Sequence, residues 1–496
     1  MKLNRKRTIY VGFAFLIICM FWQVYDSVIA KILIDSFGLS QTASGVIMAL
    51  DNIFAIVLLP IFGALSDKTN TKMGKRKPYI LFGTICASIL LVGVSIFDNA
   101  QMTKVKEANI GDITTIVFEA QETREVIKLE NGKEVVIEYT FDEGDTAYEY
   151  KYENVTKLYE TKELAAQARG VNVAEVRQFN SGYFIGFIVA LLFVLLSMAV
   201  FRTPAVSLMP DVTPKPLRSS ANAIINLMGA IGGITALIIM NFLAKDYQSY
   251  STLFIVIGTI MLLCLAFFMW KVNEPKFNKE MEDVQKEYGI DDTISEEEAL
   301  TGDAKLPKDV LKSLIFILLS VIFWYMAYNA ATSKFSVYAT TVLDTGYSLP
   351  LLVAQAAAIV TYIPIGNLSN KIGRKKTVLI GVGILFSAFF LASIINANTA
   401  ILVWVAMALA GIGWATINVN SYPMVVEMSN GSNVGKYTGI YYTASMSAQI
   451  ITPVFSGMLM DTIGFRVLFP YCVFFCALAF VTMLFVKHGE AQKIEK

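Results

Sequence analysis

Charged residues are scarce in this sequence, and the residue types that usually build catalytic or metal sites are scarcer still. Only 16% of the 496 residues are Asp, Glu, Lys or Arg, whereas 55% are hydrophobic, which is too apolar for a soluble protein of this size. The five cysteines fall in apolar runs, so neither a disulfide framework nor a metal site is indicated. Without a nucleotide-binding loop or a nucleophile elbow, we expect no enzyme: no catalytic residue, no metal and no cofactor. A nucleic-acid partner is also disfavoured.

Long apolar runs dominate what is present. A bilayer core about 30 Å thick needs about 20 residues of helix. Runs of about that length lie at 9–31, 41–62, 79–97, 181–202, 221–243, 252–271, 313–332, 347–365, 377–395, 399–422, 438–459 and 465–486. The first is not a cleaved signal peptide, because it is too long and contains Trp22, Gln23 and Asp26. The sequence therefore predicts an all-α membrane protein with twelve transmembrane helices.

Positive charge is concentrated in three clusters that alternate threading puts on one face of the membrane. The clusters contain Lys2, Arg5, Lys6 and Arg7, then Lys68, Lys72, Lys75, Arg76 and Lys77, then Lys371, Arg374, Lys375 and Lys376. The positive-inside rule makes that face cytoplasmic. We therefore expect a multi-pass protein of the inner (plasma) membrane with both termini in the cytoplasm.

The chain repeats two motifs. GALSDK at 63–68 matches GNLSNK at 366–371, and PAVSLMPD at 204–211 matches PMVVEMSN at 423–430. The first offset is 303 residues and the second is 219, so the first half holds about 84 additional residues. The predicted organisation is an N-terminal half at 1–98 and 181–272, an extracytoplasmic insert at 99–180, a cytoplasmic linker at 273–310, a C-terminal half at 311–487 and a tail at 488–496.

Two parallel six-helix halves with midplane binding sites are the architecture of the major facilitator transporters. The stretch GALSDKTNTKMGKRKP (63–78) resembles their loop between helices 2 and 3. The ending of this stretch resembles the glycoside, pentoside and hexuronide cation symporters and the sucrose transporters. The same resemblance is found in FRTPAVSLMPDVTPKPLRSSANAIINLMG (201–229). The resemblance implies a monomeric secondary transporter of a sugar with a cation. Cation-coupled relatives place carboxylates close to the Pro-x-x-Gly of helix 2, whereas here the nearest acid is Asp51, so their sodium site does not carry over.

The loop motifs favour a conformational latch over substrate contact. A helix-end carboxylate at Asp67 can accept from a neighbouring helix N-terminus or pair with Arg202, and Gly63 allows two helices to approach closely. The expected latch residues are Gly63, Asp67, Arg76, Arg202, Asp211, Arg218, Asn370 and Arg374.

The insert and the linker differ in kind. Residues 124–139 predict a β-hairpin, with a type I′ turn at Asn131-Gly132. Residues 159–179 predict a helix interrupted at Gly170. We interpret the insert as a small decoration whose replacement by a Gly/Ser linker leaves transport intact, and a binding or sensing role is the alternative. The charged linker is interpreted as a solvated, partly helical segment.

Two carboxylates inside apolar runs are the candidate ion-coupling residues. A charged side chain near the middle of a membrane helix costs roughly 2.5–3.5 kcal/mol, so it usually faces a cavity or a partner. Asp26 shares a helical stripe with Trp22 and Ile29, and Asp51 lies at a similar depth in the next helix. Two nearby acids raise each other's pKa, which suits proton coupling. The alternative is a structural role, with bonds to Lys31, Lys334 or a backbone amide.

Polar and aromatic residues at similar depth indicate the substrate class. Sugars offer hydroxyls and apolar C–H faces, so their sites combine amides or carboxylates with aromatic platforms. The candidate substrate-binding residues are Trp22, Gln23, Tyr25, Asn52, Trp324, Tyr328, Asn329, Gln355, Trp414, Asn418, Tyr442 and Gln449. Tyr325, Tyr362, Tyr441 and Trp404 are at least as well explained as interfacial anchors.

These observations favour a sugar and cation symporter that carries a di- or small oligosaccharide, with a proton preferred over sodium. Proton-driven efflux of an amphipathic compound is the alternative within transport, although such a site needs fewer amides. A transporter-derived nutrient sensor is the alternative from another class, with the insert or the linker as its signalling part.

Overall fold

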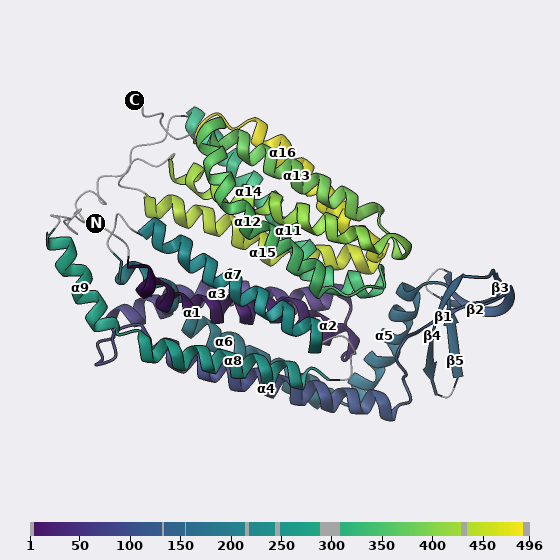
Figure 1. Ribbon diagram of the computed structural model, residues 1–496. Helices are drawn as coiled ribbons and strands as arrows, with labels where there is room; N and C mark the ends of the chain where they lie inside the picture. The colour runs from purple at the N-terminus through teal and green to yellow at the C-terminus, as the bar shows by residue number, and fades with distance from the viewer. Residues whose placement is uncertain are drawn as a thin grey trace.

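The computed structural model describes residues 4–130, 133–153, 155–213, 218–243, 249–287, 308–427 and 434–489. Two helical bundles lie side by side along their length, with a small sheet projecting from one end (Figure 1). Both termini lie at the opposite end. We call these the insert end and the terminal end.

The N-terminal half is built from apolar helices that pack around one shared core. Its elements are α1 (Arg5–Val24), η1 (Tyr25–Ile29), α2 (Ala30–Asp35), α3 (Gln41–Lys68), α4 (Lys77–Glu107), α6 (Ser181–Asp211), α7 (Arg218–Leu243) and α8 (Ser251–Lys271). α4 continues ten residues beyond the predicted end at 97, which carries the chain out of the bundle before the insert begins. Asn4 and Ser40 cap α1 and α3 with their side chains, so two of the helix starts are set locally.

The C-terminal half repeats this arrangement. Its elements are α11 (Lys308–Thr341), α12 (Ser348–Ile372), α13 (Arg374–Ile394), η3 (Ala397–Leu402), α14 (Val403–Glu427), α15 (Val434–Ile463), η4 (Phe465–Val467) and α16 (Leu468–Leu484). Within the described residues, ten helices are long and apolar enough to cross a membrane. The runs predicted at 347–365 and 438–459 fall on α12 and α15, which are outside those ten, so the count of twelve spans remains a prediction.

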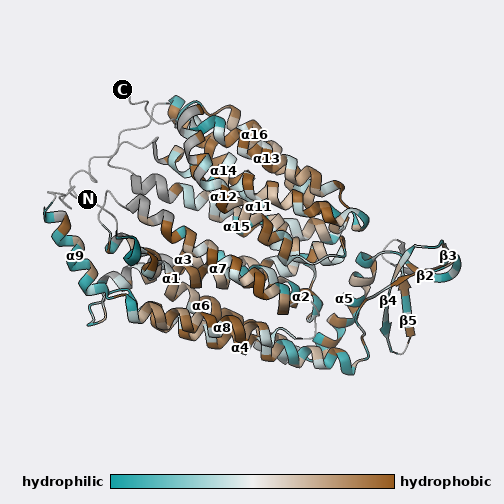
Figure 2. Cartoon of the chain, viewed as in Figure 1, coloured by the Kyte–Doolittle hydropathy of each residue, from teal (hydrophilic) through white to brown (hydrophobic). Residues whose placement is uncertain are grey.

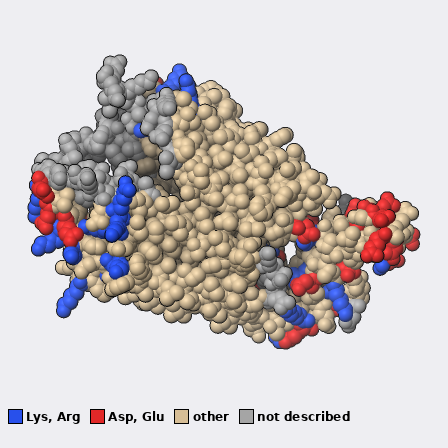
Figure 3. Space-filling view, in the orientation of Figure 1, with Lys and Arg blue, Asp and Glu red and all other residues tan. Residues whose placement is uncertain are grey.

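Apolar and charged side chains separate along the long axis. Apolar residues cover the helices, whereas the sheet and α9 (Glu274–Glu287) are largely hydrophilic (Figure 2). A broad band between the two ends shows almost no charged side chain on the visible face (Figure 3). Such a band fits the hydrocarbon core of a bilayer.

The insert is a five-stranded sheet followed by a helix, where the sequence indicated a hairpin followed by a helix. Strands β1 (Thr114–Val117), β2 (Glu122–Glu130), β3 (Lys133–Phe141), β4 (Thr146–Tyr152) and β5 (Val155–Tyr159) form one sheet in the order β1-β4-β5-β2-β3. β2 and β3 are antiparallel with Glu130 opposite Lys133, while the predicted turn at 131–132 lies outside the described residues. Helix α5 (Lys162–Phe179) packs Ala165 and Ala168 against Tyr150 and Tyr159 of the sheet.

Two sequence interpretations in these connecting segments are corrected. The interruption expected at Gly170 is absent, because α5 runs through it. A helical glycine costs about 1 kcal/mol relative to alanine, which packing offsets. The linker was expected to be solvated, yet Glu274 at the start of α9 is fully buried. The ring centroid of Phe277 in α9 lies 4.3 Å from the guanidinium carbon of Arg7, so the start of the linker packs against the N-terminal half.

Candidate functional site

Asp26 lies in a local break of helix geometry. Residues Tyr25–Ile29 form a π-helical turn between α1 and α2, and such turns occur frequently at functional sites. The wider turn shifts the side chains that follow it, so the stripe assumed from α-helical spacing is not kept. Ile29 is completely buried, whereas Asp26 retains some exposed surface.

Asp51 and Arg202 complete a charged group with Asp26. Asp51 of α3 accepts a hydrogen bond from Asn52 Nδ2 at 2.7 Å and interacts electrostatically with Asp26. Arg202 of α6 interacts electrostatically with both carboxylates. Its guanidinium carbon lies 5.5 Å from the ring centroid of Trp22. The sequence placed Arg202 in the latch with Asp67, whose side chain lies outside the described residues, and the structure brings Arg202 near the two carboxylates.

The aromatic residues next to this group have unused hydrogen-bonding atoms. Trp22 and Tyr25 pack edge to face at 5.3 Å. Neither Trp22 Nε1 nor the Tyr25 hydroxyl has a partner among the described residues, although both atoms are buried. Buried polar groups without partners are rare and call for an explanation such as a ligand or water. The predicted neighbour Gln23 donates to Ser27 Oγ at 3.3 Å.

The C-terminal half contributes an aromatic cluster. Tyr328 of α11 stacks on Trp414 of α14 with ring centroids 3.8 Å apart, and Tyr325 meets Trp414 edge to face at 5.1 Å. Tyr325 also interacts electrostatically with Tyr441 of α15. Next to Tyr441, Tyr442 interacts electrostatically with Arg202 of the other half. The interfacial-anchor interpretation of Tyr325 and Tyr441 therefore does not hold, since both lie inside this cluster.

The remaining predicted substrate residues are dispersed. Trp324 is fully buried in the core, and its Nε1 has no hydrogen-bond partner among the described residues. Asn329 Nδ2 is buried without a partner among the described residues. Gln355 of α12 lies against Gly233 of α7, where a Cβ would be 2.8 Å from its Nε2. Gln449 donates to Ser445 O at 3.4 Å. Asn418 is half-buried in α14.

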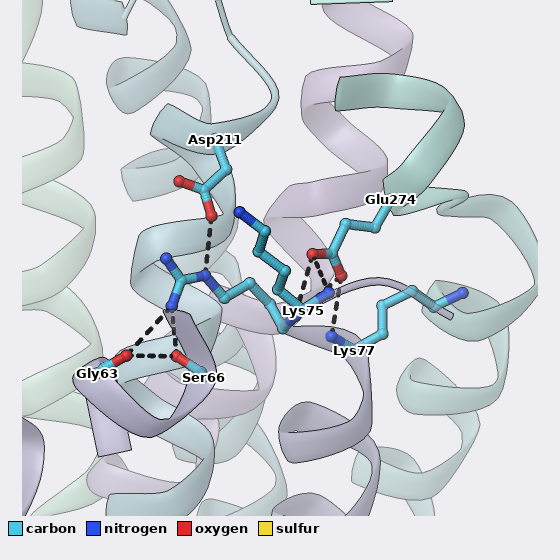
Figure 4. Close-up of polar contacts among 7 residues, drawn as sticks. Gly63, Ser66, Lys75, Lys77, Asp211 and Glu274 are labelled. Atoms are coloured by element: carbon cyan, nitrogen blue, oxygen red, sulfur yellow. Dashed lines mark hydrogen bonds and ion pairs between the residues drawn. The ribbon is translucent and has the colours of Figure 1, made fainter. Parts of the chain in front are cut away.

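The latch residues Gly63 and Asp211, labelled in Figure 4, are joined by Arg76, which hydrogen-bonds both. Arg76 Nε donates to Asp211 Oδ2 at 2.8 Å, and Arg76 Nη1 donates to Gly63 O at 3.5 Å and to Ser66 Oγ. Because these residues come from α3, α4 and α6, the group ties helices of one half together. The side chains of Asp67, Arg218 and Asn370 lie outside the described residues, and Arg374 is half-buried at the start of α13.

Sequence reasoning missed Glu274, which holds the start of α4. Its carboxylate accepts from the backbone N–H groups of Lys75, Arg76 and Lys77 at 2.7–3.1 Å. A buried carboxylate at a helix N-terminus is stabilised by these donors and by the helix dipole. Gly74 has a φ of +111°, and a Cβ there would lie 2.3 Å from Glu274 Cδ. The sequence Asn273-Glu274-Pro275, directly after an apolar run, was the signal that could have drawn attention to Glu274.

Hydrogen bonds between the two halves lie at the insert end among the described residues. Asp461 of α15 accepts from the backbone N–H groups of Gln41 and Thr42 at 2.8 and 2.7 Å. Lys334 of α11 donates to Gln41 O at 2.8 Å, and Lys31 of α2 donates to Thr340 Oγ1 at 3.3 Å. Lys31 and Lys334 thus bond across the seam between the halves, not to Asp26 or Asp51. The described structure is closed at the insert end.

Tyr347, the residue before α12, is a further contact between the halves at this end. Its hydroxyl is buried at the start of α12. This phenol interacts electrostatically with Asp35 of the other half.

Two bundles of apolar helices, with charged and aromatic residues between them, define a multi-pass membrane protein. Comparison with known families agrees. The family model described as Major Facilitator Superfamily matches residues 176–361 and 344–496, more than half of the chain. A second model, described as MFS/sugar transport protein, matches residues 11–119. The chain belongs to the major facilitator superfamily.

One curated relative is the uncharacterized MFS-type transporter C18.02 of Schizosaccharomyces pombe (strain 972 / ATCC 24843). It is 31% identical over 123 residues, which make up 25% of this chain and 27% of the relative. The chain thus matches only about a quarter of the length of that relative.

Solved structures resemble the whole chain in fold. A bacterial homologue of the iron transporter ferroportin in an inward-facing state has a TM-score of 0.62 at 11% identity, covering 97% of this chain and 99% of its own. The xylose transporter XylE from E. coli in an inward open conformation has a TM-score of 0.61 at 13% identity, covering 99% and 98%. The nucleoside transporter NupG has a TM-score of 0.57 at 12% identity, covering 98% and 100%. At these identities the likeness concerns the fold.

Proposed function

We propose that this protein is a sugar and cation symporter of the glycoside, pentoside and hexuronide group. It carries a di- or small oligosaccharide together with protons by alternating access of the two halves. It works as a monomer in the inner (plasma) membrane, with the terminal end in the cytoplasm and the insert outside. The match of residues 11–119 to a sugar-transport family model supports the substrate class.

The observation that carries the proposal is the charged group of Asp26, Asp51 and Arg202 beside the unused polar atoms of Trp22 and Tyr25. A sugar hydroxyl is both donor and acceptor. It can therefore accept from Trp22 Nε1 and donate to a carboxylate at the same position. Its C–H face suits the apolar face of an aromatic ring, and Tyr442 offers such a ring from the opposite half, close to Arg202.

Proton coupling follows from how Arg202 interacts with the two carboxylates. One cation beside two acids satisfies only one of them when both are ionised, so a proton on Asp26 or Asp51 removes the excess negative charge. Protonation then changes what the group offers to a sugar. This links the proton gradient to substrate affinity, since a coupling between two ligands must be reciprocal.

The latch and the closure complete the proposed cycle. With the terminal end in the cytoplasm, the seam bonds of Asp461 and Lys334 close the outer side, which corresponds to an inward-facing state. The group around Arg76 keeps the inner ends of α3, α4 and α6 together as the half rotates. The proposed latch thus acts as a brace within one half.

The test is uptake of labelled sugars into proteoliposomes with separately imposed proton and sodium gradients. We expect accumulation of a di- or small oligosaccharide driven by a proton gradient. Asp26→Asn keeps the shape of the side chain but fixes the neutral state. It should still exchange sugar across the membrane without net proton movement, but should no longer accumulate it. The defect should be larger for Asp26→Asn than for Asp51→Asn, because Asp26 adjoins Trp22 and Tyr25.

Asp98→Asn is the matched control. Asp98 is a buried carboxylate in α4 that accepts from Ser36 Oγ at 2.6 Å, far along the chain from the charged group. It should lose stability without losing coupling. Normal accumulation of sugar by Asp26→Asn, Asp51→Asn and their double variant would rule out the coupling role of these residues. Accumulation driven by a sodium gradient alone would show that sodium, not the proton, is the coupling ion.

A further inference from the structure

Helix α5 of the insert is bound to the N-terminal half. Arg169 Nη1 donates to Asp35 O at 3.1 Å, and Arg177 Nη1 donates to Phe37 O at 3.0 Å. Gly38, at φ +60°, lies so close to α5 that a Cβ there would be 2.4 Å from Gly170 O. α5 also continues through Asn180 into α6. These contacts make α5 move with the N-terminal half.

The other end of the same helix contacts the C-terminal half. Lys162 forms an ion pair with Asp344, in the connection between α11 and α12. Glu163 Oε1 accepts from Phe465 N at 2.5 Å, at the start of η4. Thr161 caps α5 by accepting from Leu164 N at 3.3 Å, which holds the helix start at this position. One rigid helix therefore bridges both halves.

The bridge lies over the seam between the halves. A cavity of about 640 Å³ at the insert end is lined by α5, by the N-terminal half and by the C-terminal half together. α5 contributes Arg169 and Gly170, the N-terminal half Asp35, and the C-terminal half Val337 and Asp461. Opening of this end would separate Lys162 and Glu163 from their partners, while the contacts of Arg169 and Arg177 would persist.

We propose that α5 is an outer clamp that stabilises the conformation closed at the insert end. Its releasable part is the contact of Lys162 and Glu163 with Asp344 and the Phe465 N–H. The packed sheet behind α5 supports the helix, with Asn172 Nδ2 donating to the Tyr150 hydroxyl at 2.9 Å. The proposal rests on alternating access of the two halves, and it replaces the interpretation of the insert as a decoration.

The test measures opening rather than transport, so it stays informative if the proposed substrate or coupling is wrong. Val337, which is 3% exposed, is replaced by cysteine and labelled with a maleimide in lipid nanodiscs, where both faces are accessible. Glu163→Gln removes the charge from its hydrogen bond to Phe465 N. Since a charged hydrogen bond is about twice as strong as a neutral one, the labelling rate should rise about fivefold. Adding Asp344→Asn should bring the rise to about tenfold.

Glu160→Gln is the matched control, because Glu160 pairs with Lys128 inside the insert at 2.9 Å and has no part in the clamp. It should leave the rate unchanged. Labelling of the buried native Cys472 reports unfolding and should stay at the parent level in every variant. If Glu163→Gln unfolds, Asp344→Asn alone carries the test, since asparagine tolerates the φ of +48° at this position. Equal labelling rates in the clamp variants and in Glu160→Gln would overturn the proposal.

Discussion

Asp461→Asn tests the bond across the seam that joins α15 to the start of α3. The carboxylate accepts from Gln41 N at 2.8 Å, from Thr42 N at 2.7 Å and from Thr42 Oγ1 at 2.5 Å. Asparagine offers one acceptor oxygen, and its NH₂ would face a backbone N–H. Loss of a charged hydrogen bond costs about 1.5–3 kcal/mol in buried settings. Because Asp461 is exposed, solvent screening reduces this to about 1–2 kcal/mol.

That free energy corresponds to a five- to thirtyfold shift, at about 1.4 kcal/mol per factor of ten, toward the conformation open at the insert end. Spin labels at Thr103 and Asn398, exposed residues of the two halves at this end, report the shift as a longer inter-label distance. Thr42→Val removes only the hydroxyl bond and should move the distribution less. An Asp461→Asn distribution identical to that of the parent protein would refute the view that this carboxylate holds the halves together.

Three further predictions concern the start of α4, the orientation in the membrane and the sugar site. Glu274→Gln should lower the midpoint of thermal unfolding by several degrees, since it removes charge and an acceptor from three backbone N–H groups, whereas Glu282→Gln on the exposed face of α9 should not. In intact cells an impermeant thiol reagent should label a cysteine at Glu143 in the insert but not one at Lys279 in α9, and the reverse pattern would contradict the proposed orientation. Tyr442→Phe should raise KM for the sugar about five- to tenfold with little change in kcat, because it removes a hydroxyl near Arg202, and an unchanged KM would place the sugar elsewhere.

Much of the fold could be predicted because the bilayer imposes a length on every apolar run. The repeated motifs at 63–68 and 366–371 then indicated two similar halves, and the superfamily match agrees. The sequence also indicated strands at 124–139, since β-branched residues alternate there. It could not indicate the five-stranded sheet, because the order of strands depends on pairings such as that between β1 and β4, which are far apart in the chain.

The candidate site was predicted in part. Asp26 and Asp51 stand out because a carboxylate in an apolar run is costly, and the structure brings them together with Asn52. Arg202 was predicted in the latch, which stays a prediction, and only the structure shows that its side chain lies near Trp22. The role of Trp324 as a ligand platform stays a prediction, and its burial in the core depends on a helix rotation that the sequence does not state.

The sequence by itself determined the membrane class, the two halves and the pair of intramembrane acids, because each depends on local composition and spacing. The tertiary structure decided the π-helical turn at Asp26, the burial of Glu274 and the bridge made by α5. Each of these joins segments tens to hundreds of residues apart, or depends on packing that overrides local helix geometry. No pattern along the chain encodes the direction of one side chain relative to a distant backbone, so only the packed halves could show which residues meet.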